Sequence, residues 1–455
     1  MNLISKSKEV FGQLNIKELQ KAGIEREDIK VSSHSHHIVT YPPLVALPEI
    51  NPSKIYSKDS PKFSREMALY LHLPFCTGKC LYCTYITLPN QTKEFIDGYL
   101  DAVEKEMDLL LQYPNLQDIT VNSIYIGGGT PTYLSVNQLE RVLKLLQTRF
   151  KVKKDAEITI EAGPETLIGK EGEEKLKIIL QNGVNRLSIG FQTFDDNLLK
   201  LIRRRHNSKQ AIDTYKLARK IGFKNINIDL IPGLPDQTLE IWQNDLEQIG
   251  KLNPDSITCY PLSIKQNAII WQMYTNEKQR FPSRENVILM QIMAQEFFRE
   301  LNYTEMPAGW FIRKPEKMFP TYKFTKSDDQ LALGVSAYSF INDFQYFNHR
   351  TVPQYIEALK NNNLPIWKGI KLSNENLMRR MILFGLKTGL SKHLFQSKFG
   401  KMPKDIFKEI WGKLENLGLI EEDKNTIQLT YKGKLFADEV SKEFYNEDIK
   451  KVIED

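Results

Sequence analysis

Short apolar runs alternate with longer amphipathic stretches over residues 67–263. The apolar runs are rich in β-branched residues and end in glycine, proline or polar residues, which is typical of buried strands. The amphipathic stretches, such as FIDGYLDAVEKEMDLLLQY at 95–113, repeat apolar residues with the helical period. The six apolar runs are ALYLHL at 68–73, SIYIG at 123–127, EITIEA at 157–162, RLSIGF at 186–191, INIDLI at 226–231 and SITCY at 256–260.

This alternation predicts an α/β fold. Strands joined by right-handed helical crossovers pair in parallel, so the six units predict a partial (β/α)6 parallel barrel. In such a sheet the loops at the carboxyl ends of the strands converge on one face. We therefore expect the reactive groups to gather there.

The segments that flank the alternation have a different character. Residues 1–65 end in a polar stretch punctuated by prolines and predict an N-terminal arm, and 66–310 form the predicted core. Residues 311–372 are interpreted as an aromatic extension of a substrate pocket, and 373–455 as a mostly helical, winged-helix-like domain. Four aromatic residues could line a pocket for a flat substrate, although core packing is the commoner role of any single one: Trp310, Phe311, Phe319 and Tyr322.

Composition narrows the classes of function. The 455 residues include 41% hydrophobic and 26% charged residues, as in an ordinary globular protein with more than one unit. The net charge of +6 is spread among nearly as many acids, and the candidate C-terminal helices show no dense cationic stripe, so nucleic-acid binding is not indicated. No stretch resembles a membrane span or a secretory signal, and we expect a cytoplasmic protein.

Three of the four cysteines lie within eight residues. Cys76, Cys80 and Cys83 have the spacing C-x3-C-x2-C directly after the first predicted strand. Three thiolates can hold three irons of a [4Fe-4S] cluster and leave the fourth open for S-adenosylmethionine (SAM). A structural zinc site is the alternative, but it needs four ligands, and Cys259 lies on a later strand. The motif predicts a radical SAM enzyme, in which SAM is cleaved to a 5′-deoxyadenosyl radical.

Polar residues and glycines mark the ends of the later strands. The run GGGTPT at 127–132 lets backbone groups approach a ligand closely beside the cysteine loop. Acids and amides suit ribose hydroxyls, and an arginine suits a carboxylate. The four candidates at or just beyond later strand ends are Glu161, Gln192, Arg204 and Asp229.

The histidines near these motifs have simpler explanations. His34, His36 and His37 lie in a polar arm without other obvious ligands, so solvated loop residues are the safer interpretation. His72 precedes the cysteine loop and is interpreted as a hydrogen-bonded neighbour of the cluster site and not as an iron ligand.

Taken together, these motifs resemble the oxygen-independent coproporphyrinogen III oxidases and their relatives, the HemN-like family of the radical SAM superfamily. The resemblance covers about residues 66–340, and the C-terminal module is similar as well. Its motifs are YLHLPFC, CLYC, GGGTPT, IEAGPE, RLSIGFQTFD, NIDLIPGLPDQT, LNPDSI and LGVSAYS. The resemblance implies one [4Fe-4S] cluster and two SAM molecules.

The resemblance also implies roles for individual residues. Tyr70 would lie near the cluster and SAM, and Tyr82 would pack on adenine. Those implied for the first SAM are Gly128, Gln192, Arg204 and Asp229, with the segment 261–263 bordering its adenine. Those implied for the second SAM are Gly129, Thr130 and Glu161.

Two departures from the oxidases bear on the reaction. Tyr85 stands where the true oxidases carry a further cysteine, and His37 falls where their arm carries an arginine. We therefore expect a carbon transferase of the methylase or cyclopropanase type, which adds a methyl or methylene carbon from a second SAM to an unsaturated small molecule. The alternatives are an oxidative decarboxylase or other tetrapyrrole enzyme, and a haem-binding chaperone. A reductant such as flavodoxin or ferredoxin is the expected protein partner.

Overall fold

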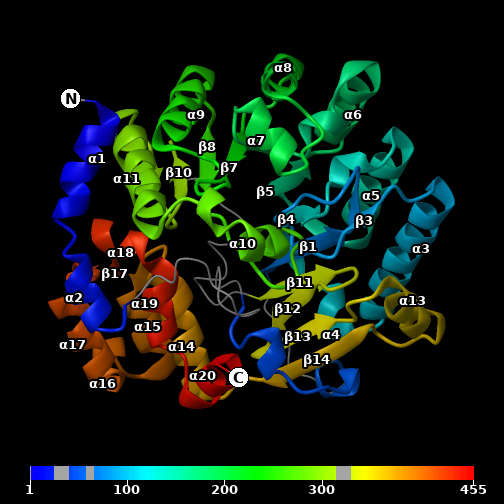
Figure 1. Cartoon of the computed structure of the whole chain (residues 1–455). Coiled ribbons are helices and arrows are strands. Elements are labelled where there is room, and N and C mark those ends of the chain that lie inside the picture. The colour runs from blue at the N-terminus through cyan, green and yellow to red at the C-terminus, as the bar shows by residue number, and fades with distance from the viewer. Residues whose placement is uncertain (1, 25–39, 58–65, 314–328, 455) are drawn as a thin grey trace.

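The computed structural model describes residues 2–24, 40–57, 66–313 and 329–454. Its centre is a twelve-stranded sheet with the order β14-β13-β12-β11-β1-β4-β5-β6-β7-β8-β10-β9. The six strands in the middle are parallel, and each falls on one of the predicted apolar runs (Figure 1). They are β1 (Glu66–Leu73), β4 (Thr120–Gly128), β5 (Lys151–Ala162), β6 (Arg186–Gln192), β7 (Ile226–Leu230) and β8 (Ser256–Cys259). The predicted partial parallel barrel is confirmed.

Helices cover the outer face of the parallel strands, and this explains why those strands are apolar on both sides (Figure 1). Each helix turns a hydrophobic stripe toward the sheet, and capping boxes at Ser135 and Asn207 fix the starts of two of them. The covering helices are α3 (Lys93–Leu110), α5 (Val136–Arg149), α6 (Gly169–Gln181), α8 (Ser208–Ile221), α9 (Leu239–Leu252) and α11 (Arg284–Glu300).

The region after α11 extends the sheet at both edges. β10 (Trp310–Ile312) and β9 (Thr304–Glu305) add antiparallel strands beside β8. At the other edge β11 (Gln330–Leu333) pairs in parallel with β1. The antiparallel strands that follow are β12 (Tyr338–Ile341), β13 (Phe344–Asn348) and β14 (Ile366–Lys371). Within the described residues no pairing joins β9 to β14, so the sheet is open.

The predicted aromatic pocket has a mixed outcome. Phe311 is buried, and its ring lies 4.7 Å from that of Phe298, so it packs in the core. Trp310 is partly exposed in β10. Phe319 and Tyr322 lie outside the described residues, as do His34, His36 and His37.

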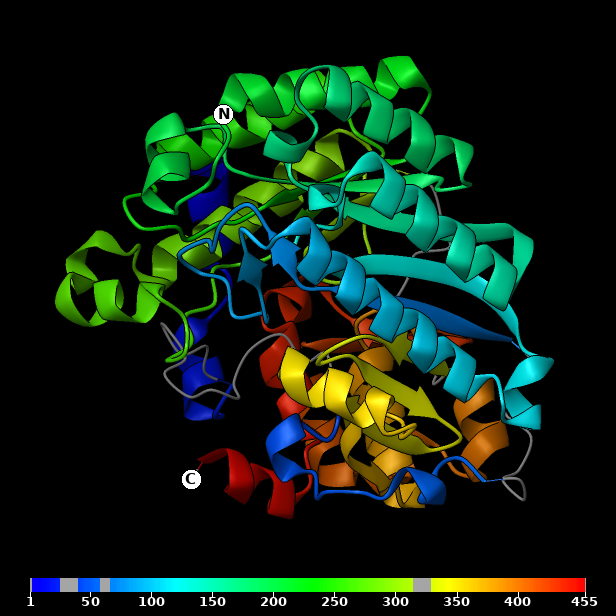
Figure 2. The same cartoon turned by 90° about the vertical axis from the view of Figure 1, so that its right-hand side faces the viewer.

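The C-terminal region is mostly helical and carries a small sheet of its own. Strands β15 (Leu390–Ser391), β17 (Thr426–Leu429) and β16 (Ile420–Glu422) form this sheet. The helical part of this region packs against the antiparallel strands of the main sheet, since Leu377 of the first helix after β14 shares a hydrophobic cluster with Phe340 (Figure 2). The helices are α14 (Asn374–Gly385), α15 (Lys392–Phe399), α16 (Pro403–Ile406), α17 (Lys408–Asn416), α18 (Tyr431–Leu435), α19 (Ala437–Glu443) and α20 (Glu447–Glu454).

Two N-terminal helices connect this region to the core. The helices α1 (Leu3–Gly12) and α2 (Ile16–Lys21) bury Leu14 and Leu19 in a cluster shared with α11 and the C-terminal helices. We retain 1–65, 66–310, 311–372 and 373–455 as a proposed division of the chain. Among the described helices, none is long and apolar enough to cross a membrane.

Candidate active site

The three clustered cysteines lie on a loop at the carboxyl end of β1. The short strand β2 (Phe75–Cys76) pairs with β3 (Leu88–Pro89) and closes this loop, which we call the cysteine loop (76–89). Cys76 is buried, whereas Cys80 and Cys83 are partly exposed and are joined by a hydrogen bond of 3.2 Å from the Cys83 N–H to the Cys80 carbonyl. Cys259 is buried on β8, which is the last of the six parallel strands and is separated from β1 by the other four.

The surroundings of Cys76 and Cys83 favour neutral thiols until a positive centre binds. Burial raises the pKa of the Cys76 thiol to about 12 and that of Cys83 to about 11. A bound metal centre overcomes such shifts because its charge stabilises the thiolate. Within the described ranges, no three His, Cys, Asp or Glu side chains converge on the position of a single metal ion. A [4Fe-4S] cluster has no such requirement, because each thiolate binds a different iron.

The glycine-rich segment at the end of β4 lies against the residues that lead into the cysteine loop, and the Thr130 hydroxyl donates to the Cys76 sulfur at 3.7 Å. The Gly129 N–H donates to the Leu73 carbonyl at 2.8 Å, and the Thr130 N–H donates to the Phe75 carbonyl at 2.7 Å. A Cβ on Gly129 would lie 2.5 Å from the Phe75 carbonyl oxygen, which is a severe clash. Gly128 has φ of +113°, a conformation that only glycine adopts readily. The glycines are therefore needed for this close contact.

Two carboxyl groups are held at the ends of β5 and β7. Glu161 accepts hydrogen bonds from the Tyr125 hydroxyl at 2.6 Å and from the Gly128 N–H at 3.1 Å. Burial raises the pKa of Glu161 to about 7. Asp229 accepts from the Asn227 side chain at 2.7 Å, and burial raises its pKa as well. Both carboxyl groups are thus fixed in orientation and can accept hydrogen bonds from hydroxyl groups of a ligand.

Gln192 ends β6 in a strained conformation. Its φ is +73°, and the pairing with β7 is irregular between Gly190 and Gln192. The Tyr260 hydroxyl donates to its side-chain oxygen at 3.4 Å. The next turn is held by the buried Asp245, which accepts from the Phe194 N–H at 2.7 Å. Backbone strain of this kind persists where the surroundings impose it, often at binding sites.

Arg204 connects the cysteine loop to the end of β6. Its guanidinium donates to the Gly190 carbonyl at 2.7 Å and to the Cys80 sulfur at 3.4 Å. Glu165 lies 4.0 Å from Arg204 and 3.4 Å from the His206 ring. Burial alone would raise the pKa of Glu165, but the charges and hydrogen bonds of Arg204 and His206 outweigh it and hold the pKa at about 2.

Sequence reasoning missed Glu165 and His206. Both lie beside residues that it singled out, since Glu165 follows Glu161 in the motif IEAGPE and His206 closes the string RRRH. Thr77, in the cysteine loop, donates to Glu165 at 3.1 Å. Glu165 therefore joins the cysteine loop to Arg204 through side-chain contacts.

Aromatic residues surround the cysteine loop. The Tyr70 hydroxyl lies 3.0 Å from Nδ1 of His72, and burial lowers the pKa of His72 to about 4, so this ring is neutral at pH 7. Tyr82 packs beside Tyr260 in one hydrophobic cluster. Tyr85 keeps 62% of its surface exposed, an unusual fraction for a large aromatic residue.

Some polar groups at the predicted SAM site remain available to a ligand. Nε of Arg204 and the hydroxyl of Ser263 are buried and have no hydrogen-bond partner in the part of the chain that the structure describes. Ser263 belongs to the segment 261–263 that the resemblance assigns to adenine. A buried polar group without a partner is costly, so these atoms fit a site that a polar ligand completes.

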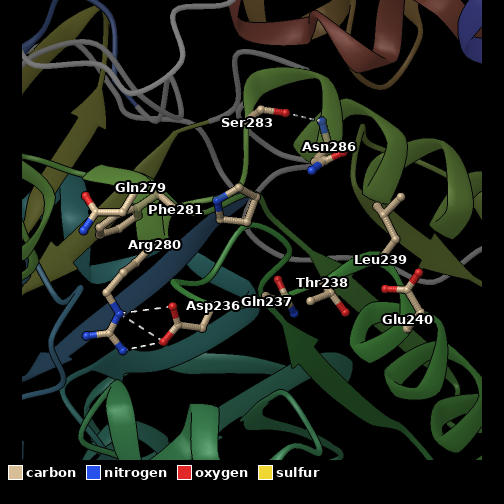
Figure 3. Close-up of a pocket in the computed structure, with 11 residues that line it drawn as sticks. Asp236, Gln237, Thr238, Leu239, Glu240, Gln279, Arg280, Phe281, Ser283 and Asn286 are labelled. Atoms are coloured by element: carbon tan, nitrogen blue, oxygen red, sulfur yellow. Dashed lines mark hydrogen bonds and ion pairs between the residues drawn. The ribbon is translucent and has the colours of Figure 1, made fainter. Parts of the chain in front are cut away.

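A surface cavity of about 440 Å³ lies elsewhere, in the loop after β7 and at the amino ends of α9 and α11 (Figure 3). Arg280 and Asp236 form an ion pair at its edge, and Ser283 caps α11 (Figure 3). None of the residues predicted to bind a cofactor lines this cavity.

Comparison with known proteins agrees with this geometry. Residues 70–249 match the Radical SAM superfamily, and residues 372–436 match the HemN C-terminal domain. The oxygen-independent coproporphyrinogen III oxidase of Escherichia coli is 30% identical over 389 residues, which cover 82% of this chain and 83% of that protein. The heme chaperone HemW of Bacillus subtilis is 29% identical over 381 residues, which cover 83% and 99% of the two chains.

The fold is similar as well. The solved structure of coproporphyrinogen III oxidase (HemN) from Escherichia coli superposes with a TM-score of 0.77 at 27% identity, covering 92% of this chain and 99% of that one. The predicted fold class and family are confirmed by these likenesses, and the chain belongs to the HemN-like family of the radical SAM superfamily.

Proposed function

We propose that Cys76, Cys80 and Cys83 hold a [4Fe-4S] cluster and that the protein uses it to cleave SAM reductively. The observation that carries this proposal is that side chains from two other segments contact the cysteine sulfurs: the Thr130 hydroxyl lies 3.7 Å from the Cys76 sulfur, and Arg204 donates to the Cys80 sulfur. When bound, the cluster supplies one electron to the sulfonium of SAM and a 5′-deoxyadenosyl radical results. A reducing, cytoplasmic setting suits free thiols of this kind.

The side chains around the loop would bind and orient SAM. Arg204 presents a planar set of donors with a free Nε, which suits the SAM carboxylate. Gln192 and Asp229 offer acceptors for ribose hydroxyls, and Tyr82 and the segment 261–263 would enclose the adenine. Gly128 would contact the same molecule through its backbone, and Tyr70 would lie beside it.

A second SAM would bind against the glycine-rich segment. Gly129, Thr130 and Glu161 are the residues we propose for it, because Glu161 is hydrogen-bonded to this segment through the Gly128 N–H. On this basis we retain carbon transfer to an unsaturated substrate as the finer proposal. It is supported by Tyr85, which is exposed where the oxidases carry a cysteine.

The named relatives favour a different outcome at the substrate. They are oxygen-independent coproporphyrinogen III oxidases and heme chaperones. The alternative proposal is therefore oxidation or binding of a tetrapyrrole. A tetrapyrrole is also an unsaturated, conjugated molecule, so both proposals can be tested on the same substrate class.

The radical SAM assignment is tested by anaerobic reconstitution with iron and sulfide. The wild-type protein should bind iron and sulfide, absorb visible light as a cluster, and form 5′-deoxyadenosine from SAM and dithionite. Cys80→Ala should lose all three properties, whereas the matched control Cys259→Ala should keep them, because Cys259 is on β8. Equal behaviour of the two variants would refute the assignment.

The finer proposal is tested with SAM that carries a deuterated methyl group. Carbon transfer predicts deuterium in 5′-deoxyadenosine together with S-adenosylhomocysteine. Unlabelled 5′-deoxyadenosine with loss of carbon dioxide from coproporphyrinogen would support oxidative decarboxylation instead. Tight haem binding without cleavage of SAM would support a chaperone.

A further inference from the structure

Two short segments lie side by side on the outside of the cysteine loop. The Leu81 N–H donates to the Ile202 carbonyl at 3.0 Å and joins residues 78–81 to residues 202–205. A Cβ on Gly78 would lie 2.4 Å from Nε of Arg205, so this guanidinium rests on the backbone of the loop. Arg204, between its two neighbours, reaches the Cys80 sulfur. The arginine run at 203–205 is thus in contact with the loop that carries the proposed cluster ligands.

The arginines of this run differ in solvent exposure. Arg204 is only 10% exposed, whereas Arg203 and Arg205 are exposed and Lys79 is partly exposed. We call Lys79, Arg203 and Arg205 the cation patch. Among the described residues none of the three forms an ion pair or a side-chain hydrogen bond. Three positive charges without a direct ion-pair partner among the described residues therefore lie beside the cysteine loop.

Nearby acids do not neutralise the patch through direct contacts. On α7 (Asp196–Leu201), Asp195 caps the helix through the Leu198 N–H at 2.9 Å, and Asp196 accepts from the Ser208 N–H at 2.7 Å. Glu165 is held by Arg204 and His206 on the inner side of the loop. The acids of this region are thus engaged in local structure.

Arg203 has an unfavourable backbone conformation. Its φ is +61°, in the left-handed region, which costs a residue with a Cβ about 1 kcal/mol or more relative to glycine. Glycine would adopt this conformation without that cost. The Arg203 N–H donates to the Lys200 carbonyl at 3.1 Å, but its side chain forms no ion pair or hydrogen bond within the described residues. The chain therefore carries a cation at a position where backbone energetics favour glycine.

We propose that the cation patch docks an acidic one-electron donor protein, such as a flavodoxin, that reduces the cluster. This inference rests on the proposed function. The patch covers the loop whose Cys80 would bind iron, so a donor seated there would lie close to the cluster. Complexes between electron-transfer proteins are small and transient, and complementary charge accelerates their formation. In each encounter the donor loses one electron and the cluster gains it.

The test reverses the charge of the patch in the full-length protein. The variant is Lys79→Glu/Arg203→Glu/Arg205→Glu. Its matched control is Lys151→Glu/Lys154→Glu/Lys224→Glu, which makes the same change in net charge at exposed lysines near the amino ends of β5 and β7. Among the described residues these lysines form no ion pair, and they lie near the amino ends of their strands, whereas the cysteine loop follows the carboxyl end of β1.

Two readouts are measured beside activity. Flavodoxin affinity is measured by titration calorimetry at low salt, and cluster reduction is followed by visible absorbance after mixing with reduced flavodoxin or with dithionite. The patch variant should bind flavodoxin about tenfold more weakly or worse and be reduced correspondingly more slowly by it. Its reduction by dithionite should be unchanged, and the control should behave as wild type. Added salt should slow flavodoxin-dependent reduction of the wild type much more than that of the patch variant.

The outcomes separate this inference from the proposed function. If the patch variant and the control bind flavodoxin equally, the docking proposal is wrong. If dithionite reduction also fails in the patch variant, Arg203→Gly decides the matter, because it removes one charge and suits the left-handed backbone. That variant must then weaken flavodoxin binding several-fold with dithionite reduction intact, or the proposal is overturned. A wild-type protein that forms no cluster would refute the proposed function, while calorimetry would still test the docking surface.

Discussion

Replacing Arg204 with methionine tests the ion-pair network behind the cysteine loop. Glu165 is 9% exposed, and its pKa is about 2 compared with the ordinary value of 4.5. At about 1.4 kcal/mol per pKa unit, this difference corresponds to about 3 kcal/mol of stabilisation at neutral pH. The charge of Arg204 is the largest contribution that lowers this pKa, and without it the burial of Glu165 is offset much less. Arg204→Met should therefore lower the free energy of unfolding by about 3 kcal/mol at pH 7.

The effect should depend on pH with a definite sign. The depressed pKa means that Glu165 stabilises the fold above pH 4.5 and that this contribution disappears as pH falls from 4.5 toward about 2. The difference between wild type and Arg204→Met should therefore shrink below about pH 4. This difference in unfolding free energy is measured by urea unfolding of the cluster-free, reduced protein, followed by circular dichroism at pH 7 and at a pH below about 4.

Neighbouring residues supply the controls. Arg203→Met removes an adjacent arginine that is exposed and should change stability by no more than about 0.5 kcal/mol. Adding Glu165→Gln to Arg204→Met removes the unpaired carboxylate and should recover part of the loss. If Arg204→Met costs no more than Arg203→Met, or costs the same at both pH values, the electrostatic account of this network is wrong.

Three further changes test other parts of the structure. Glu106 accepts three buried hydrogen bonds, and burial raises its pKa to about 7. Its contribution to stability is therefore greatest below pH 4.5 and is lost as pH rises to 7. Glu106→Gln should flatten the dependence of the unfolding free energy on pH between these values, as measured by urea titrations. Gly129→Ala should reduce the iron bound per chain after reconstitution, because its Cβ clashes with the backbone of Phe75, directly before the cysteine loop, whereas Gly98→Ala on the exposed side of α3 should leave iron binding unchanged. Asp245→Ala should lower the unfolding free energy by about 1–3 kcal/mol, because it leaves the buried Phe194 N–H without an acceptor, and a loss within 0.5 kcal/mol would contradict the role given to this carboxylate.

The parallel half of the sheet could be predicted from the sequence, but its extension could not. The six parallel strands are buried on both faces, so their apolar runs are continuous and easy to detect. The strands β11–β14 are short, and β11 pairs with β1 across more than half of the chain. Local patterns carry no information about such a distant pairing. The stretch LALGVSAYSF was therefore not recognised as the start of an additional set of strands.

The site shows a similar division. The cysteine spacing and the glycine-rich segment are local motifs, and the structure brings them into contact. Glu165 and His206 matter because they lie beside Arg204 in three dimensions, and nothing in their own local sequence reveals this. The strained φ of Gln192 arises from the irregular pairing of β6 with β7, which only the assembled sheet defines. The carbon-transfer hypothesis stays a prediction.

The pairing of β1 also has a consequence for biosynthesis. This strand leads into the cysteine loop, and it is bonded on one side to β4 and on the other to β11, whose residues begin at Gln330. A nascent chain that ends before Gln330 therefore has β1 as an open edge, which exposes unpaired backbone groups to other chains. The cysteine loop is therefore supported by a finished sheet only after about three quarters of the chain has left the ribosome. Iron and sulfide would then be delivered to a nearly full-length protein and not to an isolated N-terminal fragment that contains all three cysteines.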